Sequence, residues 1–170
     1  WAVKHKTRLY NVFFPLWILL FFPVTWLLVV PVNWVFDSLV LLVAVAAMRL
    51  RKKKELYVKS IFRVWVFGFL ADLAGAGAMA LVYGAASLLL KGETQAAFLE
   101  AFMVDPWQHP AALLATALAV LVSACVIYVL NRRFTFQKQA LPDATKGRLS
   151  LVLAAATAPY FFFVPLNWLI

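Results

Sequence analysis

Charged residues and cysteine are scarce in this 170-residue chain. Asp and Glu number 7, Lys and Arg 16, and charged residues make up only 14% of the sequence. A water-soluble protein of ordinary composition contains about 25% charged residues. Cys125 is the single cysteine and lies in an apolar run, so no intramolecular disulfide forms and we expect it to be a packing residue. These absences exclude a soluble globular domain, a disordered chain and a disulfide scaffold.

Catalytic and metal-binding patterns are also absent from the sequence. There is no combination of nucleophile and base, no pair of carboxylates on one apolar run, and no phosphate-binding glycine loop. Gly75-Ala76-Gly77 lies in an apolar run without a preceding strand, which excludes a dinucleotide-binding turn. His5 and His109 are too far apart for ordinary metal-ligand spacing. We therefore expect a protein that is not an enzyme and uses neither a metal nor a cofactor.

Apolar residues, in contrast, make up 65% of the chain and form several long runs. Each run approaches or exceeds the roughly 20 residues with which a helix crosses a bilayer. The sequence thus predicts an all-α, polytopic helical protein of the cytoplasmic membrane with about five transmembrane helices. The predicted spans are residues 12–31, 33–50, 61–90, 110–130 and 149–169.

The first two predicted spans are separated only by Pro31-Val32-Asn33, which favours a helical hairpin. Residues 1–60 then form an amino-terminal transmembrane hairpin with a basic cytoplasmic loop. Residues 61–170 form a three-span domain, with an amphipathic outer helix over 91–109 that we expect to lie on the membrane. The first run also fits a secretory signal peptide, but no small-residue cleavage site follows Val30, so we expect it to be retained.

The positions of the basic residues support an alternating arrangement that begins in the cytoplasm. With a cytoplasmic amino terminus, all but one of the 16 Lys and Arg residues lie on the inner side, as the positive-inside rule requires. A re-entrant first hairpin would give the same distribution. The net charge of +9 then indicates membrane orientation, and we expect no binding to nucleic acid. The densest basic cluster, which can also bind anionic lipid headgroups, consists of Arg49, Arg51, Lys52, Lys53 and Lys54.

Asp72 is the most informative polar residue, because a carboxylate at the centre of a membrane span costs about 3 kcal/mol. It either carries a proton or organises a polar cavity, or it is structural. A structural Asp72 would pair with a cytoplasmic arginine, for which Arg132 or Arg133 of the fourth span is the best candidate, or form a hydrogen bond to a neighbouring helix. Arg63 is a poor partner because it lies nine residues earlier, about 13 Å along the helix. Asp37 follows the predicted hairpin turn, where we expect it to cap a helix or face water.

Small residues on the third predicted span indicate close helix packing. Ala71, Gly75 and Ala78 share one helical face, and such spacing lets two backbones approach closely in lipid. Packing within the chain is one interpretation. The alternative is that this face joins a homo-oligomer or a larger membrane complex.

The end of the fourth predicted span resembles a known family. It has the sequence NRRFTF at residues 131–136, which is similar to the end of the second span in the GtrA-like family of small membrane proteins. The sequence FGFLAD at 67–72 is similar to the glycine- and aspartate-containing first span of that family. The resemblance covers residues 61–170 at most. Gly68 and Phe69 stand where the family has an asparagine-threonine pair, and the predicted first hairpin has no counterpart.

The resemblance implies a role in moving polyprenyl-phosphate-linked sugars across the cytoplasmic membrane. Arg132 and Arg133 would then bind the lipid phosphate, aided by Asn131. An ordinary helix end on the positive side of the membrane gives the same sequence, so the alternatives stay open. Three hypotheses result: a translocator or accessory for polyprenyl-phosphate-linked sugars, a non-catalytic membrane subunit or assembly partner, and a proton-coupled small-solute carrier using Asp72.

Overall fold

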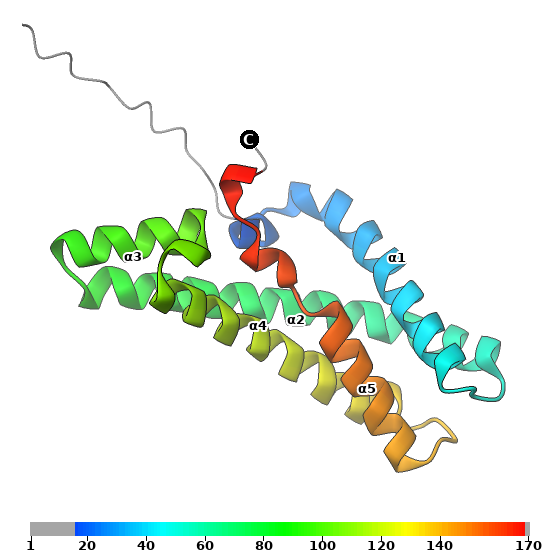
Figure 1. The fold of residues 1–170 in the computed structure, drawn as a ribbon. Helices are drawn as coiled ribbons and strands as arrows, with labels where there is room; N and C mark the ends of the chain where they lie inside the picture. The colour runs from blue at the N-terminus through cyan, green and yellow to red at the C-terminus, as the bar shows by residue number, and fades with distance from the viewer. Residues whose placement is uncertain (1–15, 169–170) are drawn as a thin grey trace, which may run out of the picture.

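The computed structural model describes residues 16–168, in which all regular structure is helical and no strand is present (Figure 1). This confirms the predicted all-α class. Three helices are long and apolar enough to cross a membrane: Pro23–Ala47, Lys53–Leu89, and Pro110–Leu130 continued to Thr135. The five α-helices are α1 (Pro23–Ala47), α2 (Lys53–Leu89), α3 (Gly92–Val104), α4 (Pro110–Leu130) and α5 (Asp143–Thr157).

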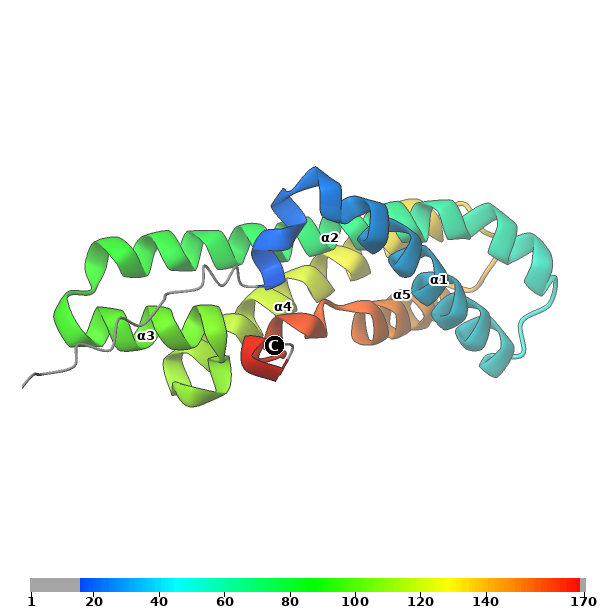
Figure 2. The ribbon, with the colours of Figure 1, turned by 90° about the horizontal axis from the view of Figure 1, so that it is seen from above.

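The long helix α2 organises the fold, since its 37 residues extend about 55 Å at 1.5 Å per residue. α1 contacts α2 and α5, and α4 contacts the same two helices, so the four form a ring. Figure 2 shows α3 folded back along the far end of α2, away from the α1–α2 loop. The short carboxyl-terminal turn η4 (Tyr160–Phe163) contacts the amino-terminal turn η1 (Leu16–Phe21) near the middle of the bundle.

The predicted hairpin at residues 31–33 is wrong, because α1 passes through this segment without interruption. The helix begins at Pro23, a residue type favoured in the first helical turn. Pro31 removes one backbone N–H inside the helix without ending it. The indole N–H of Trp65 donates to the carbonyl oxygen of Val30 at 3.0 Å and holds this part of α1 against α2. One helix therefore replaces the predicted pair of spans, and residues 12–15 of the first span lie outside the described residues.

The fifth predicted span, 149–169, is also not a single helix. α5 ends at Thr157, and Ala158 has an extended backbone (φ −61°, ψ 151°). Residues that precede a proline favour this conformation, and Pro159 follows. The chain then forms short turns that pack back on the bundle. The described residues thus contain three helices long enough to cross a membrane instead of the five predicted.

The predicted spans 61–90 and 110–130 and the predicted outer helix are confirmed as helices. α4 has the predicted bounds of 110–130, and α2 begins at Lys53, before the predicted residue 61. α3 confirms a helix within 91–109. Its apolar residues Phe98 and Phe102 are buried and belong to the protein core, and the contact of this helix with a membrane surface stays a prediction.

The core contains two apolar clusters, separated along α2 by a layer with polar groups. The cluster near α3 includes Met79 and Phe102, and the cluster near the α1–α2 loop includes Leu41 and Leu153. Asp72 of α2 lies between them. In the same layer the hydroxyl group of Ser123 on α4 donates to the carbonyl oxygen of Ala71 at 2.9 Å. A hydrogen bond to a main-chain carbonyl at this level requires that α2 and α4 approach closely.

The small-residue face predicted on α2 makes this approach within the chain. Ala71 is completely buried, and a Cβ atom at Gly75 would overlap the Oγ atom of Ser123. Ala78 is half-buried and packs on the cluster near α3. Ala71 and Gly75 are therefore covered by α4, which leaves them no exposed surface for a partner.

We expect Gly75→Ala to destabilise the protein by about 1–3 kcal/mol, because the new methyl group must push α4 away. Gly77→Ala is the matched control on the same helix, since nothing lies within 4 Å of its Cβ position. That change is expected to be neutral or slightly stabilising, because alanine favours helix by up to about 1 kcal/mol. Thermal unfolding in detergent, followed by circular dichroism, measures both. Equal midpoints for the two variants would contradict the close α2–α4 contact.

Candidate functional site

A groove lies between α2 and the turn that ends α4. This turn, η3 (Asn131–Thr135), is a π-helical turn that contains the sequence NRRFT. The groove has a volume of about 590 Å³. Its lining contains three cationic side chains, two aromatic rings and an amide, but no acidic residue. We call it the α2–η3 groove, and its lining residues are Arg63, Phe67, Arg133, Phe134, Gln137 and Lys138.

Two contacts hold the walls of the α2–η3 groove together. The Nη1 atom of Arg63 donates to the carbonyl oxygen of Phe134 at 3.0 Å. The rings of Phe67 and Phe134 pack at a tilt, with centroids 6.1 Å apart. Arg63 therefore contributes both a structural hydrogen bond and positive charge, although the sequence analysis considered it only as a partner for Asp72.

Asn131 supports the π turn from inside and does not line the groove. It is completely buried, and its Nδ2 atom donates to the carbonyl oxygen of Ile127 at 3.0 Å. Its Oδ1 atom accepts a hydrogen bond from the hydroxyl group of Thr135 at 2.9 Å. Both ends of the amide are thus occupied within the turn, contrary to the predicted contact with phosphate.

The two predicted phosphate-binding arginines differ in their contacts. The Nη1 atom of Arg132 donates to the carbonyl oxygen of Asp143 at 2.9 Å, which ties the end of α4 to the start of α5. Gly147 leaves room for this guanidinium group, since a Cβ atom there would lie 3.1 Å from the same nitrogen. Arg133 lines the α2–η3 groove and also borders a smaller groove of about 300 Å³ shared with Arg132 and Lys146. Arg133 is therefore the better placed of the two to meet an anion.

Asp72 forms a hydrogen bond to the neighbouring helix α1, one of the predicted alternatives, and contacts neither Arg132 nor Arg133. The Nδ2 atom of Asn33 donates to Asp72 Oδ2 at 2.9 Å. Asp37 lies one turn further along α1 and is also buried, so it neither caps a helix nor faces water as predicted. Its carboxyl group covers Gly68, where a Cβ atom would lie 2.9 Å from Oδ2. Asn33 and Asp37 on α1 have the same four-residue spacing as Gly68 and Asp72 on α2, which is a sequence signal for this arrangement. The sequence analysis missed the signal because it expected the helix to break at Pro31.

The basic cluster of the α1–α2 loop is exposed to solvent. Glu55 in the first turn of α2 pairs with Lys59 at 2.7 Å and with Lys52 at 3.5 Å. Arg51 and Lys52 share a third groove with Lys138 from the segment after η3. The loop and the π turn thus form one basic surface. Binding of anionic lipid by the cluster stays a prediction for Arg49, Arg51, Lys52, Lys53 and Lys54.

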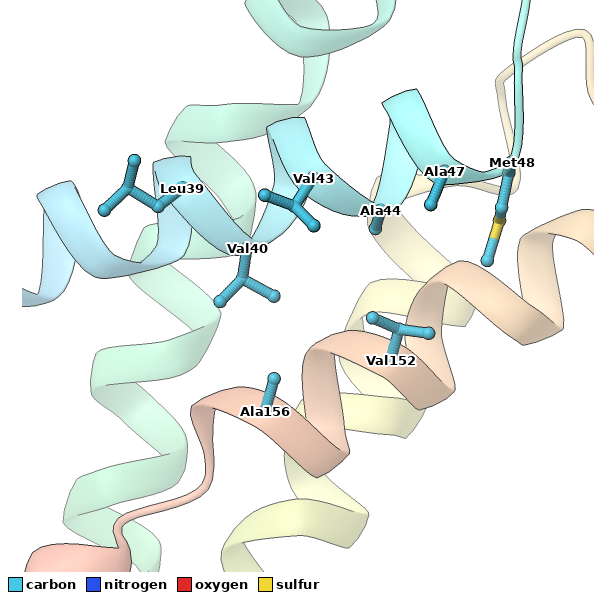
Figure 3. Close-up of a pocket in the computed structure, with 8 residues that line it drawn as sticks. All are labelled: Leu39, Val40, Val43, Ala44, Ala47, Met48, Val152 and Ala156. Carbon is cyan, nitrogen blue, oxygen red and sulfur yellow. The ribbon is translucent and has the colours of Figure 1, made fainter.

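A different groove opens on the opposite seam of the helix ring, between α1 and α5 (Figure 3). Val40 of α1 and Val152 and Ala156 of α5 point into it, and no charged residue lines it. Its volume is about 330 Å³. Since it offers no donor or charge, it can accommodate only apolar groups.

No cluster of three His, Cys, Asp or Glu side chains that could hold a metal occurs within residues 16–168. His5 lies outside the described residues. No family model matches this chain, and no curated protein or solved structure matches it either. The resemblance to the GtrA-like family therefore rests on the motif residues alone.

We expect Asn131→Ala to destabilise the protein by about 1–3 kcal/mol, because the buried hydroxyl group of Thr135 loses its acceptor. Gln137→Ala is the control, since Gln137 is exposed just beyond the same turn. Thermal unfolding of both variants, with Thr135→Val and the double variant, gives the coupling between the two side chains. If Asn131→Ala is as harmless as Gln137→Ala, this hydrogen bond does not support the turn.

Proposed function

We propose that this chain is an integral membrane protein that binds a phosphate-bearing lipid in the α2–η3 groove. By its motif resemblance, the lipid is a polyprenyl phosphate carrying a sugar, and the protein is a translocator or accessory for such lipids in the cytoplasmic membrane. The main support for this proposal is the lining of the groove, which combines the cationic side chains of Arg63, Arg133 and Lys138 with two aromatic rings.

The outer surfaces of the long helices support insertion in a membrane. In the most apolar part of α1 only 22% of residues are buried, and in that of α4 only 28%. Leu27 on α1 is 81% exposed and Leu81 on α2 is 77% exposed. Soluble monomers rarely expose continuous apolar surface of this extent, whereas lipid tails solvate it without cost.

The distribution of charge supports an orientation with the basic surface in the cytoplasm. Every Lys and Arg among the described residues except Lys91 belongs to the α1–α2 loop, the start of α2, or the segment from η3 into α5. Lys91 lies at the other end, where Glu93 and Glu100 are also found. The positive-inside rule then assigns the basic end to the cytoplasm. The predicted cytoplasmic amino terminus, with Lys4, Lys6 and Arg8, lies outside the described residues.

The groove has the chemistry that a lipid phosphate needs. Arginine binds phosphate through two parallel hydrogen bonds, and Lys138 adds a mobile positive charge. Phe134 is half-exposed at the groove, where an aromatic ring suits the membrane interface. A volume of about 590 Å³ falls in the range of about 300–1,000 Å³ typical of small-molecule sites, sufficient for a phosphate with an attached sugar. The apolar tail would stay in the surrounding lipid.

The position of the groove at one end of the bundle favours a role in one step of lipid handling. Among the described residues, the α3 end offers Lys91 as its only Lys or Arg, next to acidic residues. A phosphate would therefore be held at the basic end and not at the other. This asymmetry favours a protein that captures or presents the lipid at the cytoplasmic face. The alternative of assembly through Ala71 and Gly75 loses support, since α4 covers that face.

Labelling of introduced thiols tests the orientation. In a Cys125→Ser background, we expect Glu100→Cys to react with a membrane-impermeant maleimide in intact cells, because Glu100 is exposed on α3. Lys53→Cys and Gln137→Cys should react only after the membrane is permeabilised. Mass-tagging of the protein on gels measures the extent of reaction. Labelling of all three positions in intact cells would contradict the proposed orientation.

Substitution of a cationic residue in the α2–η3 groove tests whether the groove binds a lipid phosphate. Hydrogen bonds to charged groups contribute about 1.5–3 kcal/mol, so Arg133→Gln should weaken binding of polyprenyl phosphate about 10- to 150-fold. Arg148→Gln is the matched control, because Arg148 is exposed at the same end but does not line the groove. Native mass spectrometry of the detergent-solubilised protein measures binding, with the uncharged polyprenol as a second ligand. Equal losses in the two variants, or equal binding of polyprenol and its phosphate, would contradict the proposal.

A further inference from the structure

Asp37 and Asp72 lie together at the interface of α1 and α2. The carboxyl group of Asp37 covers Gly68, which precedes Asp72 by four residues, or one helical turn. On the other helix, Asn33 bonds to Asp72 at 2.9 Å and precedes Asp37 by the same spacing. The antiparallel helices therefore place the two carboxyl groups about one turn apart on facing surfaces. A Cβ atom at position 68 would lie 2.9 Å from Asp37 Oδ2, so a larger residue there would displace this carboxyl group.

Both carboxyl groups are shielded from solvent and incompletely bonded. Each aspartate is only 4% exposed. Asp37 Oδ2 and Asp72 Oδ1 have no hydrogen-bond partner among the described residues. None of the ion pairs formed within residues 16–168 includes either aspartate. Within residues 16–168, Asn33 is thus the single side chain that donates to the pair, and it satisfies one oxygen of the four.

The groups on the neighbouring elements supply no compensating charge. α4 contains no Asp, Glu, Lys, Arg or His. Its titratable groups are Tyr128 and Cys125, which is exposed and not a packing residue as predicted. Residues 149–157 of α5 contain no titratable side chain, and Tyr160 of η4 donates to the carbonyl oxygen of Ala155. On α2, Arg63 is bonded to Phe134, and the hydroxyl group of Tyr57 donates to Ser38 at 3.1 Å. Among the described residues, no element packed around the pair thus brings a cation to it.

We propose that Asp37 and Asp72 form a proton-binding site between α1 and α2, in which at least one carboxyl group is protonated at neutral pH. Two ionised carboxylates, desolvated and close together, repel each other and lose the hydration that stabilises them. A proton removes one charge and also converts an unpartnered acceptor into a donor. Asn33 holds the second carboxyl group in place through its hydrogen bond. This site is separate from the α2–η3 groove and does not depend on the proposed lipid.

Reaction with dicyclohexylcarbodiimide tests this site directly in the full-length protein. This apolar reagent modifies protonated carboxyl groups that are accessible from lipid. The carboxyl proton moves to a carbodiimide nitrogen while the carboxylate oxygen adds to the central carbon. The acyl group then shifts to nitrogen and leaves a stable N-acylurea, with no leaving group. We expect mass spectrometry of peptides to find the adduct on Asp37 or Asp72, and its yield to fall as pH rises from about 6 to about 10.

Two controls make the outcome specific. Glu100 is an exposed carboxylate and should remain unmodified under the same conditions. Asp37→Asn and Asp72→Asn should each abolish the adduct at the changed position, while the wild-type pH profile remains decisive if a variant does not fold. The proposal is overturned if neither aspartate reacts at low pH in the folded protein.

Discussion

The close contact of α2 with the helices on both sides of it is the constraint on which the fold depends. The carboxyl group of Asp37 on α1 packs against Gly68, and the side chain of Ser123 on α4 packs against Gly75. Both contacts occur within two helical turns of one helix. They fix the register of α1 and α4 relative to α2, and through α4 they set where the π turn meets Arg63. The groove at the basic end is therefore a consequence of packing near the middle of the bundle.

The uninterrupted apolar runs predicted the helices α2 and α4 well, because neither helix contains a proline beyond its first turn. Prolines were harder to interpret. Pro31 lies inside α1 and does not end it, whereas Pro159 ends the helical path after α5. A proline removes the same N–H group in both places, so the outcome depends on tertiary contacts such as that of Trp65 with Val30. Sequence alone does not contain this information.

The candidate sites were predictable only in part, for a similar reason. A basic helix end is visible in the sequence, and Arg133 does line a groove there. Arg63 of α2 also lines this groove, although it lies 70 residues before Arg133 in the sequence. No local sequence pattern reveals that the two residues are neighbours. Asn131 belongs to the same motif, yet its burial gives it a structural role. To predict that Asn33 is the partner of Asp72, one must know that α1 runs antiparallel to α2 without a break.

The two proposed sites are close enough to influence each other through charge. Arg63 lies five residues before Gly68 on α2, about 7.5 Å along the helix axis from the level of Asp37. An ionised aspartate pair would lower the positive potential at the groove, and a protonated pair would leave it unreduced. A proton on the pair would therefore strengthen binding of a lipid phosphate. By reciprocity, a bound phosphate would raise the affinity of the pair for a proton, so release of one favours release of the other.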